Sequence, residues 1–168
     1  EALRRLESDG LLSHEPHKGA VVRQLDYQAA NELYLMREVL EGTAAALAAR
    51  HMAEAELAAM YDILAAEEAI NDDPKEAARL NKVFHRALCH GAHNRYLLDM
   101  LDSLSLAMAL LGQTTLSLSD RKENSLVEHR QILDAIAAHD PDTAEAAARA
   151  HIRAAHRARL KLLLDEVN

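Results

Sequence analysis

The apolar residues follow a helical period from Asp26 to the end of the chain. After Asp26 they return at intervals of three and four positions, which is the spacing of one face of an α-helix. The stripe expected on this first helix consists of Leu33, Met36, Leu40, Ala44 and Leu47. Because the same period continues to residue 168 without an alternating stretch, this region is predicted to be a helical bundle rather than a sheet.

Capping residues and prolines divide the region into six expected helices. Asp26, Asp73 before Pro74, and Asn94 are suitable N-caps, and Asp140 stands before a second proline. The expected helices begin near residues 26, 53, 73, 94, 120 and 140. Since aromatic residues make up only 3% of the chain, alanine and leucine must fill most of the interior. The predicted fold class is all-α, with an antiparallel six-helix bundle over residues 26–168.

Residues 1–25 follow a different pattern. A short helical stretch ends at Gly10, and two short β-like runs then flank a turn at residues 16–19. A helix followed by a small hairpin with basic residues near its tip is typical of the C-terminal end of a winged helix-turn-helix domain. The alternative is an ordinary helix and hairpin packed on the edge of the bundle, and the spacing alone favours neither.

The charge distribution limits where nucleic acid could bind. The net charge is −8, while residues 1–25 contain four basic and four acidic side chains, so the bundle carries the whole excess of negative charge. The bundle should therefore repel phosphate backbones. The DNA-contacting candidates all lie in the N-terminal piece and are Arg4, Arg5, His17 and Lys18. Because the sequence opens in mid-helix at Glu1 and without Met, we expect a longer chain whose upstream part reads the DNA bases.

Composition favours a cytoplasmic protein. No apolar run approaches the roughly 20 residues that span a bilayer, so no membrane partner is expected. No signal-peptide pattern opens the chain. The single cysteine, Cys89, excludes an internal disulfide and fits a reducing compartment.

Three histidines and one asparagine form the clearest candidate site. Asn81 and His85 are four residues apart on one predicted helix face, and His129 and His151 lie on two later helices. Two ligands from one helix and one imidazole from each of two others would hold a metal ion inside a bundle. Any one histidine taken alone is more often a surface or capping residue than a metal ligand. Cys89, one turn beyond His85, is expected to pack as a small hydrophobic side chain.

Several segments, in the same order and at similar separations, resemble the FadR-like branch of the GntR transcription regulators. The segments are EALRRLESDGLL, PHKGAVV, LYLMREVLEGTAAALAA, LNKVFHRALCHGAHNRYL and EHRQILDAIAAHDPDTAEAAARAHI. The resemblance covers essentially the whole chain. It implies the end of a winged-helix DNA-binding domain followed by an FCD-type helical sensor domain. It also implies a homodimer that binds operator DNA and responds to a small effector, commonly an organic acid beside a metal ion.

The resemblance also assigns roles to residues. The family's metal site is an aspartate and a histidine one turn apart plus two later histidines, which correspond here to Asn81, His85, His129 and His151. Asparagine offers a carbonyl oxygen but no charge, so weaker binding of a divalent ion is expected. Zinc is the first expectation for the metal, and nickel, cobalt and manganese suit the same ligands.

The candidate effector-binding residues are Arg37, Asn94 and Gln113. In the family, an arginine at the position of Arg37 holds the effector's carboxylate, and the alternative is an ordinary helical pair with Glu41. Asn94 matches the family, although capping the next helix explains it equally. The predicted fourth helix and the residues after it add Ser103, Ser105 and Thr114 as polar candidates. Since no second arginine lies in the middle of that helix, a long dicarboxylate effector is not expected.

Two other functions fit parts of the pattern. A helical metallohydrolase would also use three histidines and an open coordination position. However, no obvious general base is paired with the cluster, because Glu128, the sequence neighbour of His129, would point about 100° away on the helix. A metal-free helical interaction module is the third possibility. The favoured prediction is a ligand-responsive transcription regulator without enzymatic activity.

Overall fold

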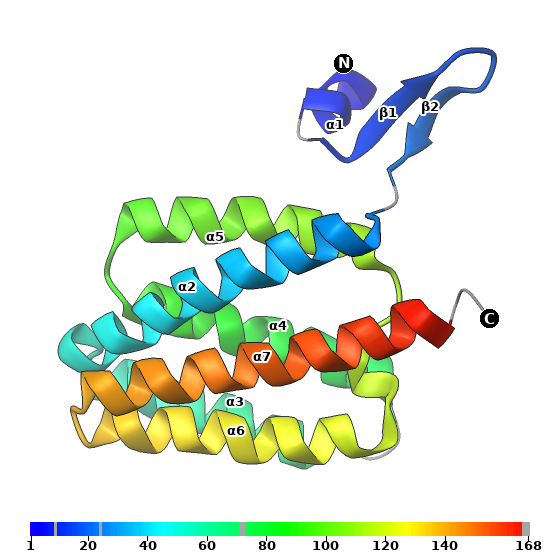
Figure 1. Cartoon of the computed structure of the whole chain (residues 1–168). Helices are drawn as coiled ribbons and strands as arrows, with labels where there is room; N and C mark the ends of the chain where they lie inside the picture. The colour runs from blue at the N-terminus through cyan, green and yellow to red at the C-terminus, as the bar shows by residue number, and fades with distance from the viewer. Residues whose placement is uncertain (9, 24, 71–72, 166–168) are drawn as a thin grey trace.

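A computed structural model describes residues 1–8, 10–23, 25–70 and 73–165. The N-terminal piece consists of helix α1 (Ala2–Ser8) and a hairpin of strands β1 (Leu12–Glu15) and β2 (Gly19–Val22). The strands are antiparallel, with Leu12 opposite Val22 and Glu15 opposite Gly19. His17 and Gly19 both have positive φ angles in the turn. In Figure 1 this piece stands apart from the helices that follow.

Six helices form the rest of the fold in the part of the chain that the structure describes (Figure 1). They are α2 (Tyr27–His51), α3 (Glu54–Glu68), α4 (Pro74–Gly91), α5 (Arg95–Met108), α6 (Ser119–Ala137) and α7 (Pro141–Asp165). Two short 3₁₀ turns, η1 (Ala109–Leu111) and η2 (Thr115–Ser117), connect α5 to α6. The prediction of a mostly helical protein with a small N-terminal hairpin is confirmed.

Side-chain caps explain several helix starts. The carboxylate of Asp26 accepts a hydrogen bond from the backbone N–H of Ala29, and Asp73 caps α4 with Pro74 in the first turn. Asn94 caps α5 by accepting from Leu97 N–H. These groups satisfy N–H donors that have no partner inside the helix. The start of α6 differs from the prediction, because Leu118 is the N-cap and Asp120 lies within the first turn.

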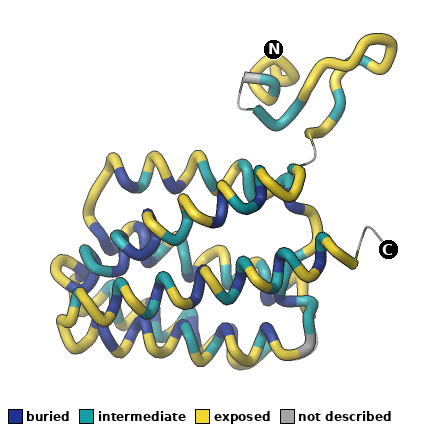
Figure 2. Tube along the Cα trace, in the orientation of Figure 1, coloured by how far each residue is buried: buried dark blue, intermediate teal, exposed yellow. Residues whose placement is uncertain are grey.

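The core depends on the close approach of α2 and α7. Alanines dominate the contact, so the two backbones come near each other without large side chains between them. At Gly42 an arginine side chain packs directly on the glycine, because an added Cβ atom would lie 2.7 Å from Cγ of Arg149. The buried residues of these two helices in the main core cluster are Ala45, Ala48, Ala49, Ala144 and Ala148. Figure 2 shows buried residues on the inward sides of the helices.

The buried face of α2 differs in one position from the predicted stripe. Leu33, Leu40 and Ala44 are buried as expected and Leu47 is half-buried, but Met36 is 44% exposed. The buried arc is centred on Ala30, Tyr34 and Glu41, and at about 100° per residue Met36 falls outside it. Among the described residues, no helix is both long and apolar enough to cross a membrane.

Replacing a core residue of α6 should destabilise the fold strongly. Ile132 is fully buried between the packed helices, so Ile132→Ala should lower the free energy of unfolding by about 2–5 kcal/mol. Val127→Ala, on the same helix at a position 58% exposed, should change it by less than about 0.5 kcal/mol. Urea unfolding followed by circular dichroism measures both. Equal effects of the two substitutions would contradict the packing described here.

Candidate metal centre

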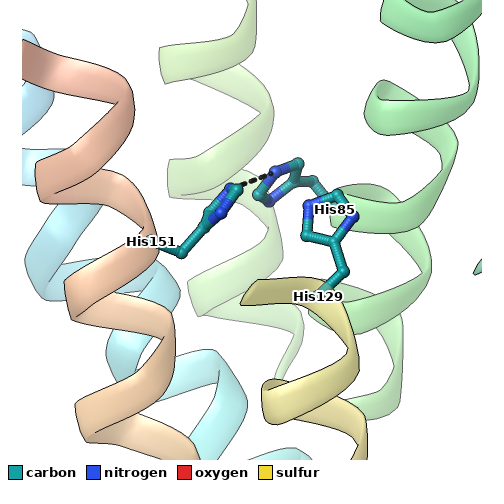
Figure 3. A group of neighbouring side chains, drawn as sticks. All are labelled: His85, His129 and His151. Carbon is teal, nitrogen blue, oxygen red and sulfur yellow. Dashed lines mark hydrogen bonds between the residues drawn. The ribbon is translucent and has the colours of Figure 1, made fainter. Parts of the chain in front are cut away.

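Three helices bring the predicted histidines together. His85 comes from α4, His129 from α6 and His151 from α7, and their rings face a common point (Figure 3). One nitrogen from each ring lies within 4.8 Å of the others. Nε2 of His85 and Nε2 of His151 are 3.1 Å apart. His129 and His151 are only 1% and 2% exposed, so the cluster belongs to the interior of the bundle.

Each of the three imidazoles has a glutamate carboxylate close to its Nδ1 atom. Nδ1 of His85 lies 2.6 Å from Glu41 Oε2, Nδ1 of His129 lies 2.8 Å from Glu67 Oε2, and Nδ1 of His151 lies 2.7 Å from Glu128 Oε2. A carboxylate at Nδ1 favours the tautomer in which Nδ1 carries the proton and Nε2 keeps its lone pair. Such pairing is the usual support of a metal-binding histidine.

The Nε2 atoms of the three histidines have few hydrogen-bond partners apart from one another. With the protons on Nδ1, the lone pairs of His85 Nε2 and His151 Nε2 would face each other, and a cation between them would satisfy both. Their separation is close to the roughly 3.3 Å expected for two nitrogen ligands of a tetrahedral zinc ion. Nε2 of His129 is buried and has no hydrogen-bond partner in the described residues. The donor set and its geometry therefore fit a divalent metal ion.

Burial keeps two of the three imidazoles, those of His129 and His151, uncharged. It lowers the pKa of His129 to about 4, although the hydrogen bond with Glu67 acts in the opposite direction. Burial also lowers the pKa of His151 well below its usual value, and the neighbouring His129 and His85 contribute in the same sense. Neutral imidazole is the form that binds a metal. Phe84 stacks on His129 with ring centroids 3.8 Å apart, which holds that ring in place.

Glu41 connects the cluster to Arg37. Nε of Arg37 lies 2.7 Å from Oε1 of Glu41, whose other oxygen faces His85. Burial alone would raise the pKa of Glu41, but the charges of Arg37 and His85 and their hydrogen bonds lower it to about 2. The helical pair between Arg37 and Glu41 that the spacing suggested is thus present. Arg37 also lies over the ring of Tyr34, 5.2 Å from its centroid.

A cavity of about 690 Å³ lies beside the histidines. His85, His151, Asn81 and Cys89 contribute to its wall. Burial raises the pKa of Cys89, so the thiol stays neutral. The charged lining residues are mostly cationic and include Arg37, Lys82, Arg86, Arg121 and Arg159, against Glu41 and Asp102. The net positive charge makes the cavity suitable for an anion.

Only some of the predicted effector-binding residues line the cavity. Arg37 lines the cavity, as do Ser103, Ser105 and Thr114. Asn94 and Gln113 are absent from the lining: the Asn94 side chain caps α5, and the Gln113 amide donates to Ser117 Oγ. The DNA-contacting candidates lie on α1 and the hairpin, where Lys18 pairs with Glu15. Asn81 lies in the same cavity wall as His85 and His151.

Two buried arginines of the cavity, Arg121 and Arg159, had not been predicted. Arg121 on α6 donates to Glu128 at 2.7 Å, and its other terminal nitrogen lies 3.3 Å from Nδ1 of His151. Arg159 lies on α7, eight positions beyond His151. Helical spacing from His151 could have indicated Arg159, since positions i+7 and i+8 share a face with position i.

Residues 32–154 match the FCD domain. The chain is 34% identical over 159 residues to a probable D-xylose utilization operon transcriptional repressor of Paenarthrobacter nicotinovorans, covering 92% of this chain and 68% of that protein. It is 30% identical to the HTH-type transcriptional regulator YdhC of Bacillus subtilis, covering 90% of this chain and 69% of that protein. The chain is an FCD-domain member of the GntR family of transcription regulators.

Solved structures agree with this membership. A GntR-family regulator from Pseudomonas syringae has 28% identity and a TM-score of 0.68, with 98% of this chain and 69% of that chain covered. McbR/YncC of Escherichia coli shares the fold, with 22% identity, a TM-score of 0.80 and coverage of 98% and 82%. The predicted GntR resemblance is confirmed. Because the relatives of this FCD-domain chain are regulators rather than enzymes, the metallohydrolase alternative is not supported.

Proposed function

We propose that this chain is the sensing part of a ligand-responsive, DNA-binding transcription regulator. Its helical domain, residues 26–168, binds a small organic acid beside a divalent metal ion, with zinc as the first candidate. One observation carries the proposal. Three histidines, each paired with a glutamate, lie next to a cavity whose charged lining residues are mostly cationic. A metal-free interaction module would have no need for either feature.

The metal would be held by His85, His129 and His151, with Asn81 or water completing its shell. When bound, the ion supplies a positive centre that an acid oxygen can ligate. Glu41, Glu67 and Glu128 orient the three rings through Nδ1. Nickel, cobalt and manganese suit these ligands too, so availability decides which ion is present.

Arg37 would provide the second contact for the acid. Its guanidinium borders the same cavity as His85 and His151, and a guanidinium can bind a carboxylate through two parallel hydrogen bonds. One of its nitrogens is already held by Glu41, which fixes the group without occupying all of its donors. Short hydroxy- or keto-acids fit this arrangement better than acyl chains, because serines and threonines also line the wall.

The N-terminal piece, residues 1–25, would belong to the DNA-binding domain. Arg4, Arg5, His17 and Lys18 are exposed on α1 and the hairpin, where they can contact phosphates. We propose that the protein acts as a homodimer on operator DNA in the cytoplasm. Phosphate contacts of this kind position a domain, while base reading comes from other residues.

Metal binding should depend on the buried histidines only. His129→Ala removes a buried ligand, so the variant should contain no divalent metal. A chelator should then no longer lower its melting temperature, as it should for the wild-type protein. His90→Ala, an exposed position on α4, should leave both unchanged. Elemental analysis and melting curves with and without chelator measure these effects. A wild-type protein that takes up no divalent ion would remove the metal from the proposal.

Effector binding should require Arg37. Metal-loaded protein should show a melting temperature that rises with the concentration of a short hydroxy-acid, because a ligand of the folded state stabilises it. Arg37→Ala should raise the acid concentration needed for the same increase in melting temperature by about 10- to 100-fold. That is the range expected for the loss of one charge-assisted hydrogen bond. A thermal-shift series on both proteins is the test. Hits only among uncharged or long-chain compounds would contradict an anion sensor.

DNA binding should depend on the basic residues of the N-terminal piece. In the protein with its complete DNA-binding domain, Arg5→Ala and Lys18→Ala should weaken binding to all sequences similarly. Each should also reduce the slope of log affinity against log salt by roughly 0.9 per lost phosphate contact. Arg130→Ala, which removes an exposed charge on α6, serves as the control. Fluorescence anisotropy over a salt series measures the slope, and an unchanged slope in all three variants would refute the assignment.

A further inference from the structure

Arg159 is a buried cation without a carboxylate partner among the described residues. It is 4% exposed. Its Nη1 donates to the backbone oxygen of Leu111 at 2.9 Å, and its Nη2 donates to that of Gln113 at 2.7 Å. Its Nε is buried and has no hydrogen-bond partner in the described residues. The guanidinium is therefore held in position, but its charge is not neutralised by a neighbouring anion.

The other arginines in the cavity's interior differ in this respect. Arg37 is paired with Glu41 and Arg121 with Glu128, each at 2.7 Å. Taking a charge out of water costs several kcal/mol unless an opposite charge or enough hydrogen bonds replace the water. Two carbonyl oxygens replace part of the lost hydration of Arg159. An anion in the cavity would replace the rest.

The position of Arg159 separates it from the metal centre. It lies eight residues beyond His151 on α7, which corresponds to roughly 12 Å along the helix axis. Both residues line the same cavity. The volume of about 690 Å³ also exceeds what a three-carbon acid would fill. The cavity thus has two separate positive regions, one at the histidines with Arg37 and one at Arg159.

We propose that Arg159 forms a second anion subsite, so that the effector is an extended dianion. One carboxylate would lie at the metal and Arg37, and a carboxylate or phosphate at the far end would meet Arg159. This inference rests on the proposed anion-sensing function and specifies its ligand class. It also revises the expectation from the sequence. A long dicarboxylate was not expected because the predicted fourth helix lacks a second arginine, and the structure supplies one from α7 instead.

A purely structural role for Arg159 would consist of tethering the segment between η1 and η2. That role uses the contacts of Nη1 and Nη2 with the two carbonyl oxygens. It leaves the Nε–H edge unused, and it does not require the residue to border a cavity. Arg159→Gln keeps an amide donor for the tether but removes the charge, so it tests the charge separately from the tether.

The test compares matched acids on the metal-loaded protein. α-Hydroxyglutarate and α-hydroxyvalerate differ only by a terminal carboxylate in place of a methyl group, and phosphoglycerate and glycerate differ by a phosphate. Wild-type protein should bind at least one dianion about 10- to 100-fold more tightly than its matched monoanion. Arg159→Gln should reduce that preference to near unity while leaving monoanion affinity unchanged. Isothermal titration calorimetry gives the dissociation constants of the four acids for each protein.

Arg153→Gln is the control for net charge. It removes one positive charge from α7 at an exposed position that pairs with Glu38 outside the cavity, and it should retain the wild-type preference. Monoanions and dianions that bind the wild type equally, or a preference that survives Arg159→Gln, would overturn the second subsite and leave the anion sensor intact. No binding of any acid to the wild type would overturn both. If Arg159→Gln does not fold, the wild-type comparison of matched acids decides alone.

Discussion

The packing of α2 against α7 determines where the charged groups of this domain can lie. Alanines at the contact allow the two backbones to approach each other closely. Arg37 and Glu41 of α2 therefore share a cavity wall with His151 of α7, and α4 contributes His85, which contacts Glu41. Larger side chains at the alanine positions would separate the helices and move Glu41 away from the histidines. The site is thus a consequence of the core rather than an addition to it.

A second constraint is electrostatic, because the interior contains many ionisable groups for a bundle of this size. Their arrangement is alternating: Arg37 meets Glu41, Glu41 meets His85, and Arg121 meets Glu128, which meets His151. Such networks add little stability compared with apolar packing, and removing one member leaves a buried charge unpaired. Their retention in the interior is better explained by a binding role than by stability. Arg159 stands outside the alternation, which is why it is informative.

Much of the fold was predictable because its signals are local. The caps at Asp26, Asp73 and Asn94 and the helical period each depend on neighbouring residues. The three histidines were predictable in kind from their helical settings. Their carboxylate partners were not, because Glu67 meets His129 and Glu128 meets His151 across helices whose relative rotation no local pattern specifies. Glu128 illustrates this limit: its sequence neighbour is His129, yet its contact is with His151.

The asparagine at position 81 gives the proposed site an unusual charge balance. Three neutral imidazoles and an amide oxygen would surround a divalent ion without a negative ligand, and the nearest carboxylates already bond to the outer nitrogens of the rings. An acid that ligates the ion would supply the missing charge, so each should bind more tightly in the presence of the other. By linkage, the factor by which metal strengthens acid binding equals the factor by which acid strengthens metal binding. An aspartate at position 81 would provide the charge permanently and weaken that dependence. The neutral residue would therefore make metal occupancy itself responsive to the effector.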